Sequence, residues 1–298
     1  MSTVTVLTIA STQKAPKAGR IRAFLKKDRI LTACLAGVLL LFLIVLIGPM
    51  VWPIDANAVS LADKLQPPSA AHLLGTDSVG RDMVARLLVG ARNSLGAGLI
   101  IALIGAVLGA LTGLLAGAFG GWVDTALTWL TNSILCFPTI MLAMAVVMAF
   151  RPGIEAVVIG LSIHSFPWYM RTLRGEVLRI SSLDFIRSTR AIGAKERRVL
   201  FVHIFPHLIS TMILQMAAVF GAAVLSLAAL GYLGLGAQPP TAELGAMITE
   251  GQQYFLTGEW WVAAFPGLIL LIAVSLTTVI ADRAREVLDP RGEYVASE

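Results

Sequence analysis

The chain has 298 residues, of which 57% are hydrophobic and 14% charged, with a mean hydropathy of +0.81. About a quarter of the residues in soluble domains are charged, so this composition excludes an ordinary soluble protein and indicates an integral membrane protein. The net charge of +5 does not indicate nucleic-acid binding, because the basic residues lie between apolar segments, where they orient a chain in a membrane.

The first apolar segment follows a basic N-terminal stretch. Residues 1–29 hold seven Lys or Arg residues, and residues 30–52 are then almost entirely apolar. A segment of this length can cross a bilayer of about 30 Å and is too long for the core of a signal peptide. We therefore expect residues 1–29 to be a cytoplasmic tail and residues 30–52 to be a retained anchor helix.

Residues 53–92 are expected to lie on the opposite, extracytoplasmic side. They contain the strings His72-Leu-Leu-Gly-Thr-Asp77 and Gly80-Arg-Asp82. Asp77, Arg81 and Asp82 predict a capped turn with a surface ion pair, which contributes little to stability. Apolar residues that share one helical face follow this turn and predict a short interfacial helix along the membrane surface. They are Met83, Val84, Leu87, Leu88 and Ala91.

Five further spans are expected in residues 93–281, at about 94–119, 122–150, 154–170, 208–235 and 260–281. In the first of these, a glycine recurs every four residues from Gly105 to Gly117, which predicts the close approach of a neighbouring helix. Pro138 predicts a break in the next. With the anchor helix, these segments predict an all-α membrane protein of six transmembrane helices.

The distribution of basic residues orients these spans. With both termini in the cytoplasm, 18 Lys and Arg residues fall on the inner side and 5 on the outer side. This bias agrees with the excess of positive charge on cytoplasmic loops. The C-terminal tail, residues 282–298, is therefore also expected to be cytoplasmic.

His164 lies inside the fourth predicted span. An ionisable residue in a span is a functional hypothesis by default, which makes His164 a possible pore residue. A neutral imidazole can also donate a hydrogen bond to a backbone carbonyl freed by Pro167, three residues later. We favour this structural role and keep the pore as the alternative.

A charged segment, residues 181–206, separates the fourth and fifth spans and must lie in water, because charge at the bilayer centre costs about 2.5 to 3.5 kcal/mol per residue. Ser181 and Asp184 form a capping-box pattern at the start of a short amphipathic helix. Gly193 predicts a break, after which a second short helix leads into Pro206. The cations alone have a simpler explanation, since they also hold the loop in the cytoplasm.

Two further strings complete the pattern. Gly236-Ala-Gln-Pro-Pro-Thr241 lies in the outer loop after the fifth span, and Leu288-Asp-Pro-Arg291 lies in the C-terminal tail. These strings together resemble those of the inner-membrane permease subunits of binding-protein-dependent ABC importers for dipeptides and oligopeptides, a group that also includes nickel permeases. Residues 185–206, FIRSTRAIGAKERRVLFVHIFP, resemble the cytoplasmic coupling loop of this family, with Arg187-Ser-Thr189 in place of the usual Glu-Ala-Ala.

The resemblance implies a type I ABC importer permease fold with a cytoplasmic coupling helix, in the cytoplasmic (inner) membrane of a bacterium. It assigns contact with an ATPase to Phe185, Ile186, Arg187, Arg190, Ala191, Gly193, Ala194, His203 and Pro206. It assigns outer loops that dock a binding protein to Asp77, Arg81, Asp82, Gln238, Pro239 and Pro240.

The partners implied by the resemblance are a homologous second permease subunit, two ATPase subunits that bind ATP and Mg, and an extracytoplasmic solute-binding protein. No cofactor or metal is expected in this chain. The sequence holds no GxxxxGK[ST] phosphate loop and no nucleophile or metal-ligand pattern, so we expect a pore-forming subunit that is not an enzyme.

Two alternatives within transport stay open. The same architecture could import nickel or a metal chelate, because selectivity in such systems is set largely by the binding protein. An autonomous secondary carrier or channel is disfavoured, because the spans hold few of the intramembrane carboxylates that ion-driven carriers need. The cargo itself is not encoded in any string of the sequence.

Overall fold

The computed structural model of the protein describes residues 28–288. The predicted cytoplasmic tail before residue 28 and the Asp-Pro-Arg part of the C-terminal string therefore lie outside the described residues. Residues 28–288 form helices and connecting turns. Within them, Thr76 and Asp82 form an isolated β-bridge, and there is no β-strand. The all-α prediction is confirmed.

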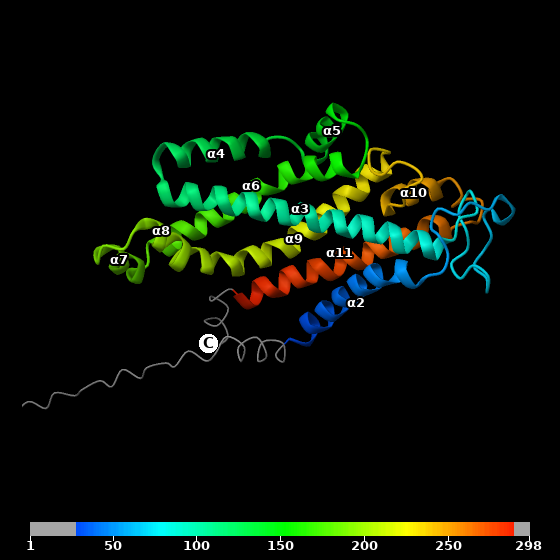
Figure 1. Cartoon of the computed structure of the whole chain (residues 1–298), viewed down its shortest axis with the longest axis horizontal. Coiled ribbons are helices and arrows are strands. Elements are labelled where there is room, and N and C mark those ends of the chain that lie inside the picture. Colours follow the sequence, from blue (N-terminus) through cyan, green and yellow to red (C-terminus); the bar gives the residue numbers. More distant parts are fainter. Residues whose placement is uncertain (1–27, 289–298) are drawn as a thin grey trace, which may run out of the picture.

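Helix bounds follow the hydropathy pattern closely. The long helices are α2 (Arg29–Val51), α3 (Met83–Phe119), α6 (Ile154–Ser181), α9 (Phe205–Tyr232) and α11 (Trp261–Leu288). The shorter elements are η1 (Leu61–Asp63), α4 (Gly121–Leu135), α5 (Thr139–Ala149), α7 (Asp184–Ala191), α8 (Glu196–Arg198), η2 (Val199–Ile204) and α10 (Leu244–Gln252). The long helices form a bundle, with α7 and α8 at one end and the loop before α3 with α10 at the other (Figure 1).

Four helical stretches are long and apolar enough to cross a membrane: Arg29–Val51, Met83–Phe119, Glu196–Tyr232 and Trp261–Glu286. The pair α4 and α5 becomes a fifth if it counts as one span, and its two parts are bent by 90°. The break that Pro138 predicted is thus present. The remaining predicted span is α6, which is long enough but less apolar, because polar residues such as His164 and Arg171 interrupt it.

The separate interfacial helix predicted after Asp82 is wrong. Residues 83–91 are the first turns of α3, which continues for 37 residues, or about 55 Å, without a break. The shared apolar face of Met83, Leu87 and Ala91 is buried against protein, in a cluster that includes Met247 from α10 and residues of α11. A helical face covered by neighbouring helices has the same 3.6-residue period as one covered by a membrane surface.

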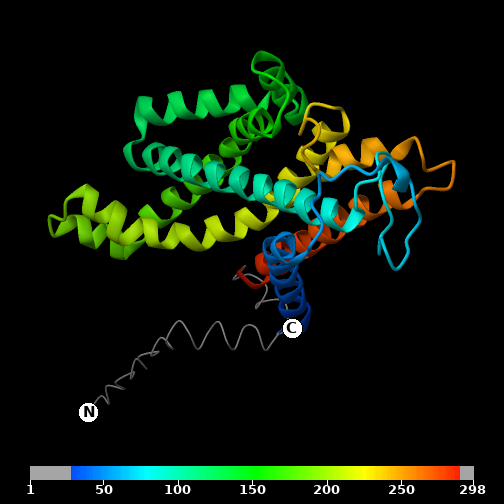
Figure 2. The same cartoon turned by 45° about the vertical axis from the view of Figure 1, so that its right-hand side comes forward.

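The glycine ridge of α3 packs against α6, as the spacing predicted. A Cβ atom added at Gly109 would lie 2.2 Å from the Cβ of Tyr169, and one at Gly117 would lie 2.7 Å from Cγ1 of Val177. The two backbones therefore approach more closely than any larger residue permits. Figures 1 and 2 both show α3 and α6 side by side.

Helix α6 is longer than the predicted span. The prediction ended this span at residue 170, whereas α6 runs on to Ser181 and carries Arg171, Arg174 and Arg179 in its last turns. Arg174 forms a bidentate ion pair with Asp124 of α4, and Arg179 pairs with Glu176 one turn away. The paired Arg174 and Arg179 let the helix extend beyond its apolar part.

Candidate functional site

Residues 182–204, which we name the coupling hairpin, form a compact unit at one end of the bundle. Helix α7 ends at Ala191, and the next turns close on Gly193, whose φ is +84°. The Gly193 N–H donates to the carbonyl of Arg190 at 2.9 Å, and the Ala194 N–H donates to the carbonyl of Thr189 at 3.3 Å. This bond pattern is a Schellman motif, so the predicted glycine break is confirmed.

The capping-box prediction is wrong. Because α6 continues to Ser181, this residue closes one helix instead of opening the next, and its buried hydroxyl has no hydrogen-bond partner among the described residues. The N-cap of α7 is Leu183, which makes no side-chain capping bond. Asp184 lies in the first turn of α7, where a carboxylate interacts favourably with the helix dipole.

The hairpin is anchored on one side and exposed on the other. Ile186 is fully buried in a cluster with residues of α6, η2 and α9. Phe185 and Ile192 are 46% and 85% exposed. Arg190 and Glu196 form two hydrogen bonds across the glycine turn, at 2.9 and 3.2 Å, which join the two arms of the hairpin. A rigid unit with exposed apolar side chains fits a contact with another protein.

The other predicted coupling residues divide by exposure. Arg187, Ala191 and Pro206 are exposed, and Ala194 and His203 are half-buried. The second predicted short helix is not separate, because Glu196–Tyr232 forms one helical stretch. It contains a wide π-helical segment, in which the Phe205 N–H donates to the carbonyl of Leu200. Pro206 has no N–H and its ring crowds the preceding turn, which accounts for the wider winding before it.

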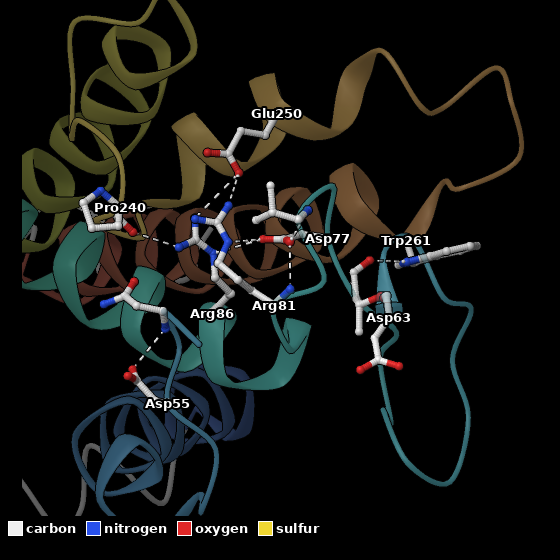
Figure 3. A network of polar contacts seen from close by, with 11 residues as sticks. Asp55, Asp63, Asp77, Arg81, Arg86, Pro240, Glu250 and Trp261 are labelled. Carbon is white, nitrogen blue, oxygen red and sulfur yellow. Dashed lines mark hydrogen bonds and ion pairs between the residues drawn. The ribbon is translucent and has the colours of Figure 1, made fainter. Parts of the chain in front are cut away.

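At the other end of the bundle, a buried ion network joins the loop before α3 to α10. Asp77 accepts hydrogen bonds from the backbone N–H groups of Val79 and Arg81, both at 2.9 Å, and pairs with the Arg81 side chain. Arg81 also pairs with Glu250 of α10 at 3.1 Å. Arg86, which is 2% exposed, lies 3.6 Å from Asp77 and from Glu250 (Figure 3).

Sequence reasoning missed most of this network and took its core for a surface ion pair. Asp77, Arg81 and Asp82 are 2%, 7% and 2% exposed, so the surface prediction is wrong. Asp82 caps α3 by accepting from the Ala85 N–H, and it also accepts from the indole N–H of Trp52 at 3.0 Å. The sequence did offer one signal for Arg86, because this charged residue lies among the apolar residues at the start of α3.

The second outer string lies against this network but keeps an exposed edge. The carbonyl of Pro240 accepts from Arg86 at 2.9 Å. The side chains of Gln238, Pro239 and Pro240 are exposed. Of the six predicted outer residues, these three remain available for contact with another protein, whereas the buried three shape the loop.

Glu243, which follows the second outer string, is a buried acid whose burial the sequence did not predict. Its carboxylate is fully buried, caps α10 by accepting from the N–H groups of Gly245 and Ala246 at 2.8 and 2.9 Å, and accepts from the Ser94 hydroxyl at 3.1 Å. Burial raises the pKa of Glu243 above its ordinary value, while these hydrogen bonds act in the opposite direction.

His164 lies beside the break between α4 and α5. Its Nε2 atom is 2.8 Å from the hydroxyl oxygen of Thr139, and its Nδ1 atom is buried without a partner among the described residues. The favoured contact with a carbonyl freed by Pro167 is therefore wrong, because the first turn of α5 supplies the partner. His164 also lines a cavity of about 730 Å³ beside this break.

The fold and the coupling hairpin together define a class: a multi-pass transmembrane subunit whose helices end in a packed hairpin, as in importer permeases. Residues 109–293 match the family of binding-protein-dependent transport system inner membrane components. The chain belongs to this family of ABC importer permeases and is a multi-pass protein of the inner membrane.

Several relatives are similar over most of their length. A protein described as "Probable D,D-dipeptide transport system permease protein DdpC" of Escherichia coli is 35% identical over 89% of both chains. The glutathione permease GsiD of Pectobacterium atrosepticum is 38% identical over 91% of this chain and 89% of its own. The dipeptide permease DppC of Alkalihalophilus pseudofirmus is 34% identical over 90% and 88%.

A solved structure shares the fold. A chain of the inward-facing MetNI methionine ABC transporter superposes with a TM-score of 0.55, at 22% identity, over 70% of this chain and 98% of its own. At this identity the similarity concerns the fold alone, and it confirms the type I ABC importer permease architecture.

Proposed function

We propose that this chain is the pore-forming subunit of an ATP-driven importer that carries dipeptides or oligopeptides across the bacterial cytoplasmic membrane. Relatives named for dipeptides and for glutathione, which is itself a small peptide, support this class of cargo. The same names make nickel or a metal chelate the less favoured alternative. The inner-side excess of Lys and Arg supports cytoplasmic termini.

The coupling hairpin is the observation that carries the proposal. It is packed by Ile186 onto the ends of α6 and α9, so a force on α7 moves both helices together. Phe185 and Ile192 offer apolar side chains to a groove on a separate ATPase subunit, which binds ATP and Mg. Two such ATPase subunits, one for each permease of a heterodimer, would move the two halves of the pore.

The opposite end is the proposed docking surface for an extracytoplasmic solute-binding protein. Its exposed edge consists of Gln238, Pro239 and Pro240. The loop beside this edge is held in place by the buried charged side chains of Asp77, Arg81 and Asp82. In this arrangement the permease contacts the binding protein at one end of the bundle and the ATPase at the other.

Reconstitution in vesicles tests this function. The complete set of two permeases, two ATPases and the liganded binding protein is expected to take up a labelled dipeptide only when ATP is supplied. Vesicles with this chain alone are expected to take up none. Uptake by this chain alone, without nucleotide, supports the secondary-carrier or channel alternative and contradicts the proposal.

A further inference from the structure

We propose that the break between α4 and α5, with the facing side of α6, forms a water-filled part of the transport path in which Arg171 binds the C-terminal carboxylate of the peptide. This inference rests on the proposed function, because it names the group of the cargo that the path recognises.

The break lies at the depth of the membrane core. Thr139, the first residue after it, contacts His164, and the next residue of α6, Ser165, packs against Gly105 of α3. Gly105 is four residues from Ile101, the midpoint of α3, or about 6 Å along the helix axis. A hydrocarbon core of about 30 Å extends about 15 Å to each side of its centre, so this position lies within the core when α3 is centred on the bilayer.

The N–H groups of Cys136 and Phe137 donate to the carbonyls of Asn132 and Ile134, so within the break only carbonyl groups can lack a backbone partner. Residues 136–138 are outside both helices, and Cys136, Phe137 and Pro138 are all exposed on this chain. Non-helical backbone in the hydrocarbon layer occurs only where protein buries it or where it lines a water-filled cavity. Broken helices in transporters are also the usual place of substrate sites near the midplane.

Polar side chains surround the break on one side. The cavity of about 730 Å³ beside it is lined by Asn132 of α4, by residues of the break, by Thr139, and by His164, Trp168 and Arg171 of α6. His164 is 9% exposed, and its Nδ1 atom has no partner among residues 28–288. An unpaired buried nitrogen at the edge of a cavity is satisfied most simply by water or by a ligand.

Arg171 is the cation of this cavity and lacks a counter-ion. Its guanidinium donates to the side-chain oxygen of Asn132 at 3.0 Å, and no carboxylate of residues 28–288 pairs with it. Arg174 and Arg179 on the same helix each have a carboxylate partner. Arg171 lies six residues beyond Ser165, or about 9 Å along α6 toward the coupling hairpin. A guanidinium there can pair with an anion, and it binds a carboxylate with two parallel hydrogen bonds.

The anion that fits is one that every peptide carries. A free peptide ends in a carboxylate, whatever its side chains, so a single arginine can serve a path that accepts many sequences. The polar neighbours Asn132, Thr139 and His164 offer hydrogen-bonding groups to the peptide backbone without fixing its side chains.

Cys136 is a natural probe, because it lies at the break and lines the same cavity as Arg171. The complete importer is placed in nanodiscs with Cys34→Ser, without nucleotide, and Cys136 is labelled with an anionic or a cationic methanethiosulfonate reagent. We expect labelling, with the anionic reagent favoured by Arg171. Arg171→Gln is expected to lower the ratio of anionic to cationic rates at least about threefold. Arg179→Gln, a loss of the same charge outside the cavity, leaves the ratio unchanged.

The same assay tests the carboxylate. The dipeptide Ala-Ala is expected to slow the labelling of Cys136, whereas the same dipeptide with a C-terminal amide is expected to leave the labelling rate unchanged. In Arg171→Gln, Ala-Ala is expected to give no protection of Cys136. An unlabelled Cys136 means that lipid or the second permease covers the break. Equal protection by acid and amide, or protection that survives Arg171→Gln, means that Arg171 does not bind the carboxylate. Each of these results overturns this inference but leaves the proposed function intact, provided that the wild-type importer takes up dipeptide when ATP is supplied. Absence of that ATP-driven uptake contradicts the proposed function itself.

Discussion

At the scale of single residues, Gly193 is the position where backbone conformation decides the structure of the coupling hairpin. A Cβ atom there would meet nothing within 4 Å, so space does not explain the glycine, whereas its φ of +84° does. Glycine adopts this region freely, and asparagine does so at a reduced cost. For other residues the cost is about 1–2 kcal/mol.

Gly193→Ala is therefore expected to loosen the hairpin by about 1 kcal/mol, and Gly193→Asn by less. Hydrogen–deuterium exchange at the amides of Gly193 and Ala194 measures the loss, which corresponds to about fivefold faster exchange for the alanine variant. The control is Gly175→Ala, because Gly175 lies within α6 with nothing within 4 Å of an added Cβ. Unchanged exchange in Gly193→Ala would show that the glycine conformation does not hold the turn.

Glu243 gives the outer end of the bundle a predictable pH dependence. Burial raises its pKa above the ordinary value of 4.5, so above that pH the folded state holds the proton more tightly than the unfolded state. The contribution of the neutral form is complete below the unfolded pKa and is lost as the pH rises through the folded pKa.

Wild-type protein in detergent is therefore expected to lose stability as the pH rises above the ordinary carboxyl pKa of 4.5, and Glu243→Gln is expected to have a weaker pH dependence. Thermal unfolding over a series of pH values above 4.5 measures the difference. The variant also loses one acceptor for the Ala246 N–H, so its stability at low pH is lower than that of the wild type. Parallel pH curves for the two proteins would contradict the raised pKa.

At the scale of elements, the α3–α6 pair depends on its glycine ridge. A Cβ at Gly109 meets Tyr169 and the Met170 backbone nitrogen at 2.2 and 2.8 Å, and backbone atoms cannot move aside as a flexible side chain can. Gly109→Ala is expected to destabilise the protein by about 1–3 kcal/mol, measured by thermal unfolding in detergent.

The matched control is Gly96→Ala, in the same helix, where an added Cβ meets nothing within 4 Å. This substitution is expected to be neutral or slightly stabilising, because alanine has the higher helix propensity. If both variants unfold at the same temperature, the close contact between α3 and α6 is not what holds them together.

The elements also show what the sequence could and could not predict. Hydropathy located the long helices. The glycines of α3 predicted the close helix contact, and Gly193 predicted the turn of the hairpin, because these signals are local. The face of residues 83–91 was misread, since periodicity does not say whether protein or membrane covers a face. The pairing of Arg81 with Glu250, 169 residues apart, has no local signal.

At the scale of the whole molecule, the coupling hairpin lies at one end of the long helices, and the loop before α3 lies with α10 at the other (Figures 1 and 2). This loop and α10 carry the outer ion network. Helix α9 starts in the hairpin region and ends beside α10, which Glu250 ties to the network. Motion imposed at one end can therefore reach the other through continuous helices, which is what an importer driven by a separate ATPase requires.

The most direct test of this account is the binding of the partner ATPase to the hairpin. Ile192→Asp places a charge on a side chain that is 85% exposed, so the permease is expected to fold as before but to lose co-purification with the ATPase and ATP-driven uptake of dipeptide. Val59→Asp, at an apolar side chain of the outer loop that is 60% exposed, is expected to retain ATPase binding. Unchanged ATPase binding and uptake in Ile192→Asp would contradict the central claim that the hairpin transmits force from the ATPase.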